Sequence, residues 1–242
     1  MANLKAVIFD YYETLVALST EPRERMFDAL AHRLGGYLAP GEAIRHWREL
    51  TTKDALIRFG SAERPPLDGP TAPFRSFEDV WRQRSDELFR HWGVDTPSAV
   101  GAEAYAEAHA AAPLYPEVAA ALAALRERFI VAVLSDADDG FLRENVRRNG
   151  LAFDIVVSSE ELRAYKPHVT LFHETCARLG VEPAEAMYVG DSPWADIAGA
   201  RHAGLRAVWI NRHEHAWPED IAEADATVTS LAEVATHLDG AA

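Results

Sequence analysis

Short, mainly apolar runs recur along this chain and mark its predicted strands. The first, residues 6–9 with the sequence AVIF, leads directly into Asp10, and later runs lie at residues 129–134, 154–157, 186–189, 207–210 and 226–228. Apolar runs without regular polar alternation are typical of strands buried on both faces. Segments with helical spacing separate the later runs. This alternation predicts an α/β fold, a Rossmann-like, doubly wound parallel sheet with helices on both faces.

The residues between the first and second strands follow a different pattern. Apolar residues there recur only at helical spacing, which predicts helices that include one from Ser76 to His91 and another from Ser98 to Ala111. Residues 61–73 contain four prolines and one glycine, so we expect a loop there. No strand is predicted in this block.

The domain organisation follows from the first strand. Residues 6–9 have the apolar character of the later strands and no similar run nearby, so we place them in the same sheet. The sequence therefore predicts a core built from residues 1–16 and 113–242. Residues 17–112 would be inserted into that core as a helical cap domain.

Composition and charge narrow the possible partners. The chain has 242 residues, 48% of them hydrophobic, and a net charge of −14 from 38 acidic and 24 basic residues. Such a surface repels phosphate backbones and anionic lipids, so we expect no nucleic-acid partner and no membrane partner. The single cysteine excludes an intramolecular disulfide, no apolar run has the length of a membrane span, and the first strand begins close to Met1. We expect a cytoplasmic protein, and nothing in the sequence predicts its oligomeric state.

Polar side chains follow several of the predicted strands. In a parallel sheet the carboxyl ends of the strands lie at one edge, where ligands of such folds bind. The residues expected to meet at that edge are Asp10, Tyr12, Thr14, Ser135, Asp136, Lys166, Asp191 and Asp196. Several carboxylates beside one lysine and one serine are difficult to explain as ordinary solvated surface.

These residue types fit phosphoryl transfer. Asp10 and Asp191 would repel each other unless a proton or a cation lay between them, and Mg²⁺ is the hard cation that prefers oxygen ligands. Asp10 could then attack phosphorus to form an aspartyl phosphate that water hydrolyses. Lys166 and the hydroxyls of Ser135 and Thr14 would stabilise charge on the transferring group.

Four segments together resemble the haloacid dehalogenase (HAD) superfamily of hydrolases. In chain order they are FDYYETL with Asp10, VLSD with Ser135, YKP with Lys166, and VGDSPWADIAGARHAGL with Asp191 and Asp196. With the alternating core and the inserted cap, the resemblance covers essentially the whole chain. It implies a hydrolase in which Asp10 is the nucleophile and the cap selects the substrate.

The resemblance leaves two chemistries open. Phosphatases of the superfamily usually carry a second aspartate, a general acid and base, where this chain has Tyr12, and a tyrosine there is similar to the 2-haloacid dehalogenases. The cap segment HWREL with Arg48 and the segment WINR at residues 209–212 also resemble dehalogenases. In contrast, Asp191 matches the phosphatase metal ligand, and Phe172 stands where dehalogenases have a tyrosine. Dehalogenases need no metal.

We favour the Mg²⁺ interpretation because a second carboxylate facing Asp10 would attract a cation or a proton to a metal-free nucleophile. The resemblance implies a metal site formed by Asp10, the backbone carbonyl of Tyr12 and Asp191. Asp196 would orient Lys166 or a metal-bound water, and Arg48 and Asp136 would contact a small anionic substrate. The alternatives are a metal-free hydrolase of 2-halo acids that attacks carbon, and a non-catalytic member of the superfamily.

Overall fold

Six parallel strands form one sheet in the computed structural model, which describes residues 3–18, 45 and 64–240. The spatial order is β3, β2, β1, β4, β5, β6, which confirms the predicted doubly wound core with the first strand at its centre. Register aligns Ile8 of β1 with Ala132 of β2 and Tyr188 of β4. The strands are β1 (Ala6–Phe9), β2 (Ile130–Ser135), β3 (Ile155–Ser158), β4 (Ala186–Gly190), β5 (Arg206–Ile210) and β6 (Ala226–Val228).

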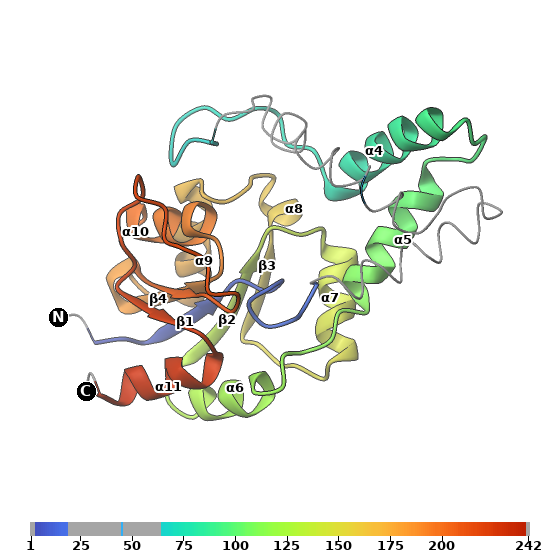
Figure 1. Ribbon diagram of the computed structural model, residues 1–242. Coiled ribbons are helices and arrows are strands. Elements are labelled where there is room, and N and C mark those ends of the chain that lie inside the picture. The colour runs from blue at the N-terminus through green and yellow to red at the C-terminus, as the bar shows by residue number, and fades with distance from the viewer. Residues whose placement is uncertain (1–2, 19–44, 46–63, 241–242) are drawn as a thin grey trace.

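Helices connect these strands and lie on both faces of the sheet (Figure 1). The predicted connecting helices are present, although residues 195–203 divide into a π-helical turn and a short α-helix. The helices are α6 (Val118–Arg126), α7 (Asp139–Arg148), α8 (Ser159–Leu162), α9 (Val169–Leu179), η1 (Pro183–Glu185), η2 (Pro193–Ala198), α10 (Gly199–His202) and α11 (Leu231–Gly240). α8, η1 and α11 were not predicted; the first two are only one turn long.

Alternate residues of β1 enter two separate hydrophobic cores. Val7 and Phe9 pack in one cluster with apolar residues of α6, α7 and α11. Ala6 and Ile8 pack in the other, with residues of α9 and α10. All four side chains are completely buried, as expected for a strand covered on both faces. The central position of β1 therefore brings the residue that follows it to the middle of the carboxyl edge.

Two described helices extend beyond the sheet, at the upper right of Figure 1. They are α4 (Phe77–Trp92) and α5 (Ala99–Ala110), which confirm the helices expected at residues 76–91 and 98–111. Ser76 caps α4 by accepting a hydrogen bond from the backbone N–H of Asp79, and Gly93 ends it in a left-handed conformation. The other helices expected in the cap, and Arg48, lie outside the described residues, so the cap boundaries stay a prediction.

Helix α7 of the core holds both α4 and α5. The carboxylate of Asp138, just before α7, accepts the backbone N–H groups of Phe77 and Glu78 at 2.8 Å each, which satisfies the N-terminus of α4. The fully buried side-chain amide of Asn145 donates to the carbonyls of His109 and Ala112 at the end of α5, at 2.8 and 2.9 Å.

A proline-rich strap, residues 64–76, leads into α4 and has no helix or strand of its own. It is hydrogen-bonded to the core in several places. The carbonyl of Leu67 accepts the backbone N–H of Val169 at 2.8 Å, and the carbonyl of Pro65 accepts Trp194 Nε1 at 3.1 Å. Residues assigned by sequence to the cap therefore lie against the core. Within the described residues no helix is both long enough and apolar enough to cross a bilayer.

The α7 contacts give a prediction for stability. Replacing Asn145 with alanine removes the donor for the carbonyls of His109 and Ala112 and the acceptor for the Tyr11 hydroxyl, 2.8 Å away. We expect the free energy of unfolding to fall by about 2–4 kcal/mol, because buried polar groups lose their partners. Urea denaturation measures this value. Glu144→Ala, on the exposed side of the same helix, is the control and should have a much smaller effect; equal losses would contradict the prediction.

Candidate active site

Asp10 stands at the carboxyl end of β1, in the middle of the sheet edge. Its backbone N–H donates to the carbonyl of Val189 at 2.9 Å, which ties it to β4. Its carboxylate is buried, and Oδ1 accepts hydrogen bonds from Ser135 Oγ at 3.1 Å and from Lys166 Nζ at 2.7 Å. The sequence prediction that these three residues meet is therefore confirmed in space.

Among the described residues, the ammonium of Lys166 has three hydrogen-bond partners, all buried. Besides Asp10, it donates to Asp196 Oδ1 at 2.6 Å and to the hydroxyl of Tyr188 at 2.9 Å. The backbone N–H of Lys166 donates to Asp136 Oδ1 at 3.0 Å. Asp136, expected to contact substrate, therefore uses this carboxylate oxygen to hold the segment that delivers the lysine.

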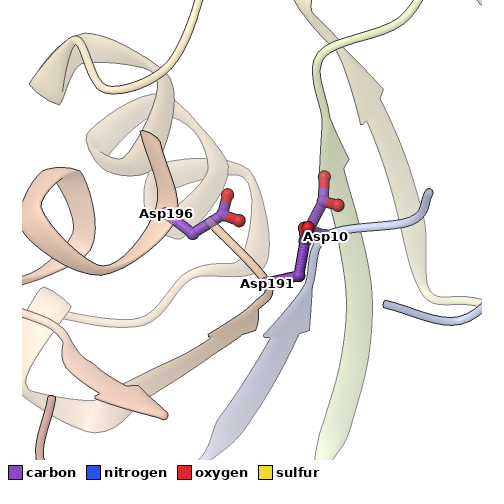
Figure 2. A group of neighbouring side chains, drawn as sticks. All are labelled: Asp10, Asp191 and Asp196. Carbon is purple, nitrogen blue, oxygen red and sulfur yellow. The ribbon is translucent and has the colours of Figure 1, made fainter. Parts of the chain in front are cut away.

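Three carboxylates gather at this edge. One oxygen from each of Asp10, Asp191 and Asp196 lies within 4.8 Å of the others. Figure 2 shows these side chains approaching one another: Asp10 from the end of β1, Asp191 from the turn after β4, and Asp196 from η2. The carbonyl of Asp191 accepts Trp209 Nε1 of β5 at 2.7 Å, so the turn is fixed from the neighbouring strand. Asp196 Oδ2, the oxygen that does not contact Lys166, accepts a hydrogen bond from the backbone N–H of Ser192 at 2.9 Å.

Burial and mutual repulsion change the protonation of this cluster. Burial raises the pKa of Asp10 to about 6, although Lys166 acts in the opposite direction. Burial also raises the pKa of Asp191 well above its usual range, and the charges of Asp196 and Asp10 add to this effect. Burial alone would lower the pKa of Lys166, but Asp10 and Asp196 outweigh it and raise that pKa. The site therefore contains one firmly held cation and an excess of negative charge that a proton or a metal cation would relieve.

Two glycines allow the fourth motif to approach this cluster. A Cβ atom on Gly190 would lie 2.4 Å from Cγ of Asp196, and one on Gly199 would lie 2.7 Å from the ring of Phe172. Real Cβ atoms do not approach so closely, so glycine at 190 lets the Asp196 carboxylate turn towards Lys166. Glycine at 199 allows close packing against α9.

Comparison with known proteins identifies the family. A model described as haloacid dehalogenase-like hydrolase matches residues 4–204. The chain belongs to this family. It is therefore a hydrolase of the HAD superfamily, as the four motifs predict.

Relatives of the chain catalyse different reactions. It is 36% identical over 196 residues to phosphoserine phosphatase of Thermus thermophilus, covering 78% of this chain and 76% of the relative. It is 28% identical over 218 residues to (S)-2-haloacid dehalogenase 1 of a Pseudomonas species, covering 88% and 86%. The crystal structure of 2-haloacid dehalogenase from Pseudomonas syringae, 25% identical, superposes with a TM-score of 0.69 over 99% of this chain and 100% of that one. Family membership thus leaves the phosphatase and dehalogenase chemistries both open.

Tyr12, whose resemblance to dehalogenases raised the second chemistry, packs its ring among aromatic side chains. The ring packs against His109 and Phe141, with centroids 5.1 and 5.9 Å apart, and its hydroxyl lies 3.5 Å from the carbonyl of His109. Burial raises the pKa of the phenol, with smaller contributions from Tyr11 and Asp10. The side chain thus packs between the turn after β1 and the helices α5 and α7.

The turn after Tyr12 is held by groups that the sequence did not indicate as site residues. Thr14 is completely buried and its hydroxyl has no hydrogen-bond partner in the described structure. Its carbonyl accepts two hydrogen bonds from Arg212, at 3.1 and 2.7 Å. Glu13 has φ 63°, a left-handed conformation that favours glycine and strains other side chains. Its carboxylate accepts Leu18 N–H at 2.8 Å and the Tyr115 hydroxyl at 2.9 Å, so it stabilises the turn.

Close packing at Gly190 gives a testable prediction. Gly190→Ala would place Cβ against Asp196 and force that carboxylate away from Lys166. We expect the free energy of unfolding to fall by about 1–3 kcal/mol, the usual cost of overpacking. Chemical denaturation monitored by circular dichroism would measure it. Gly140→Ala is the matched control, since nothing lies within 4 Å of the added atom; a Gly190 variant as stable as this control would refute the close contact.

Proposed function

We propose that the protein is a Mg²⁺-dependent phosphatase of a small anionic metabolite. The observation that carries this proposal is the placement of Asp191 beside Asp10 in a cluster of three carboxylates that has only Lys166 as a described cationic contact. The name of one relative, phosphoserine phosphatase, supports the same class of reaction. The proposal also includes a cytoplasmic location, and it includes no membrane or nucleic-acid partner.

The residues present fit a magnesium ion. Mg²⁺ prefers oxygen ligands. Burial and neighbouring carboxylates raise the pKa values of Asp10 and Asp191, so a divalent cation that takes the place of a proton would stabilise their charged forms. Asp10, Asp191 and the backbone carbonyl of Tyr12 would hold it. Asp196 is occupied by Lys166 and by the Ser192 N–H, so its role is to position the lysine. When bound, the metal would neutralise charge on a phosphoryl group.

The side chains around Asp10 indicate how the reaction would proceed. Oδ1 is hydrogen-bonded to Lys166 and Ser135, so we expect Oδ2 to attack phosphorus. The new bond joins this oxygen to phosphorus while the bond to the leaving oxygen breaks, giving an aspartyl phosphate and a leaving oxyanion, which takes any proton it needs from water. Lys166 and Ser135 would then donate to phosphoryl oxygens. Water cleaves the aspartyl phosphate and restores the carboxylate.

The leaving group receives little help from the described side chains. The Tyr12 hydroxyl faces the carbonyl of His109, and the Glu13 carboxylate is hydrogen-bonded to Leu18 and Tyr115. Neither group is placed to protonate an alkoxide. We therefore propose a substrate whose leaving group departs without a strong acid, such as an acyl or aryl phosphate.

A metal-free 2-haloacid dehalogenase is the second candidate. Tyr12 and the similarity to (S)-2-haloacid dehalogenase 1 favour it. In that reaction Asp10 would attack carbon and Arg48, outside the described residues, would bind the substrate carboxylate. Asp191 opposes this candidate, because it places a second carboxylate beside the nucleophile, and the charge of Asp10 raises the pKa of Asp191 in the absence of a cation.

The metal requirement tests the proposal directly. Hydrolysis of p-nitrophenyl phosphate should require Mg²⁺, stop in EDTA and return when Mg²⁺ is added in excess. Asp191→Asn should reduce kcat at least about 100-fold, because it removes a carboxylate from the metal site. Asp95→Asn, an exposed aspartate on the loop between α4 and α5, is the control. Hydrolysis unaffected by EDTA would disprove the proposal, and EDTA-resistant halide release from 2-chloropropionate would establish the alternative.

Leaving-group dependence tests the missing acid. We expect kcat/KM for p-nitrophenyl phosphate to exceed that for glycerol phosphate by about 100-fold or more, the usual contribution of a general acid. Tyr12→Asp should raise the rate on glycerol phosphate and narrow this gap, whereas Tyr12→Phe should not raise it. Similar kcat/KM values for both esters in the unmodified protein would show that another group supplies the proton.

A further inference from the structure

We propose that Tyr188 is a positioning residue that fixes the direction in which Lys166 presents a hydrogen bond to the phosphoryl group. The inference rests on the proposed phosphatase function, although the same contact would guide Lys166 in any reaction at Asp10. Tyr188 lies inside β4, two residues before the fourth motif's Gly190, and its ring is completely buried.

The ring of Tyr188 crosses the central strand. Tyr188 is aligned with Ile8 of β1, yet its hydroxyl donates to the carbonyl of Leu134 on β2 at 2.8 Å, on the far side of β1. Phe172 of α9 packs edge-on against the ring with centroids 5.1 Å apart. Strand, hydrogen bond and packing together leave the phenol oxygen little freedom to move.

The hydrogen atoms at this site can be assigned. Tyr188 has one hydroxyl hydrogen, which the carbonyl of Leu134 accepts, so the phenol oxygen presents its lone pairs to Lys166 Nζ at 2.9 Å. The ammonium has three hydrogens, and its acceptors are Asp10, Asp196 and Tyr188. The nearby Asp196 oxygen, 3.2 Å from the hydroxyl, competes for the same hydrogen as Leu134 but at greater distance. Lys166 therefore has no spare hydrogen for a phosphoryl oxygen in this state.

One of these three bonds has to be exchanged during the reaction. Asp10 is the partner that changes, because its carboxylate charge disappears when it forms the aspartyl phosphate. Asp196 and Tyr188 stay as acceptors. Two fixed acceptors on a tetrahedral ammonium define the direction of its third N–H, which then points at the phosphoryl oxygen. With Asp196 as the remaining acceptor, rotation of the ammonium about its Cε–Nζ bond would be less restricted.

Binding of orthovanadate, a mimic of the phosphoryl group, tests this role without relying on turnover. Isothermal calorimetry in the presence of Mg²⁺ would compare the unmodified protein with Tyr188→Phe, Lys166→Met and the double variant. We expect Tyr188→Phe to weaken binding about tenfold, the effect of one hydrogen bond to a charged group. The double variant should bind no more weakly than Lys166→Met, because Tyr188 acts through the lysine.

Tyr11→Phe is the matched control. It also removes the hydroxyl of a completely buried tyrosine, but that hydroxyl donates to Asn145, away from Lys166. We expect it to lower the melting temperature while leaving the vanadate dissociation constant unchanged. Calorimetry is done at a temperature where both variants are fully folded, so that lost stability does not change the apparent dissociation constant. A purely structural role for Tyr188 would then leave it unchanged.

The outcomes separate this inference from the proposed function. Vanadate binding by Tyr188→Phe equal to that of the unmodified protein, or full additivity with Lys166→Met, would overturn the role of Tyr188. If Lys166→Met does not fold, Tyr188→Phe against Tyr11→Phe decides the question. If the unmodified protein does not bind vanadate, the phosphatase proposal fails. The role of Tyr188 is then decided by halide release: Tyr188→Phe should lower kcat relative to Tyr11→Phe and leave KM unchanged. If the unmodified protein neither binds vanadate nor releases halide, both the proposed function and the role of Tyr188 are overturned.

Discussion

The ammonium of Lys166 lies 2.7 Å from Asp10 and 2.6 Å from Asp196, with Asp191 beside them, at the buried edge of a parallel sheet. Removing charges from water is costly unless partners and hydrogen bonds compensate. One cation faces three carboxylates here, so the cluster is internally unbalanced, and the surrounding residues have to hold like charges close together. Most of the unusual local features of the site can be understood as answers to that requirement.

Several residues distant in sequence help to hold these like charges together by fixing backbone segments of the site. Arg212 holds the carbonyl of Thr14, and Trp209 holds the carbonyl of Asp191, so the turns after β1 and β4 are both restrained from β5 and the residues following it. Gly190 gives Asp196 room to turn inward. Asp136 restrains the backbone of Lys166 from the end of β2. Rigid turns allow repelling groups to remain in place without relaxing apart, at a cost in stability that the two hydrophobic cores offset.

The sequence predicts which residues meet at the site because the order and direction of the strands largely determine their positions. Apolar runs identify the strands, and a parallel sheet then sends Asp10, Ser135 and Asp191 to one edge whatever the details of packing. The directions of individual side chains are not encoded so simply. Tyr12 follows the nucleophile but turns to α5, and Asp136 turns to the lysine backbone. Tyr188 lies within an apolar run, where its position indicates only core, and its hydroxyl reaches Lys166 because the geometry of three strands allows it.

The proline-rich strap also changes how the two parts of the chain should be separated in experiments. Sequence places residues 64–76 inside the inserted block, but the carbonyls of Pro65, Leu67 and Arg75 accept hydrogen bonds from Trp194, Val169 and Tyr165 of the core. A chimaera that exchanges the inserted block with that of a relative at its sequence boundaries would remove these bonds from the segments on either side of the lysine and the fourth motif. Exchange of specificity between members of the family would therefore be cleaner if the strap were transferred with the core that it binds.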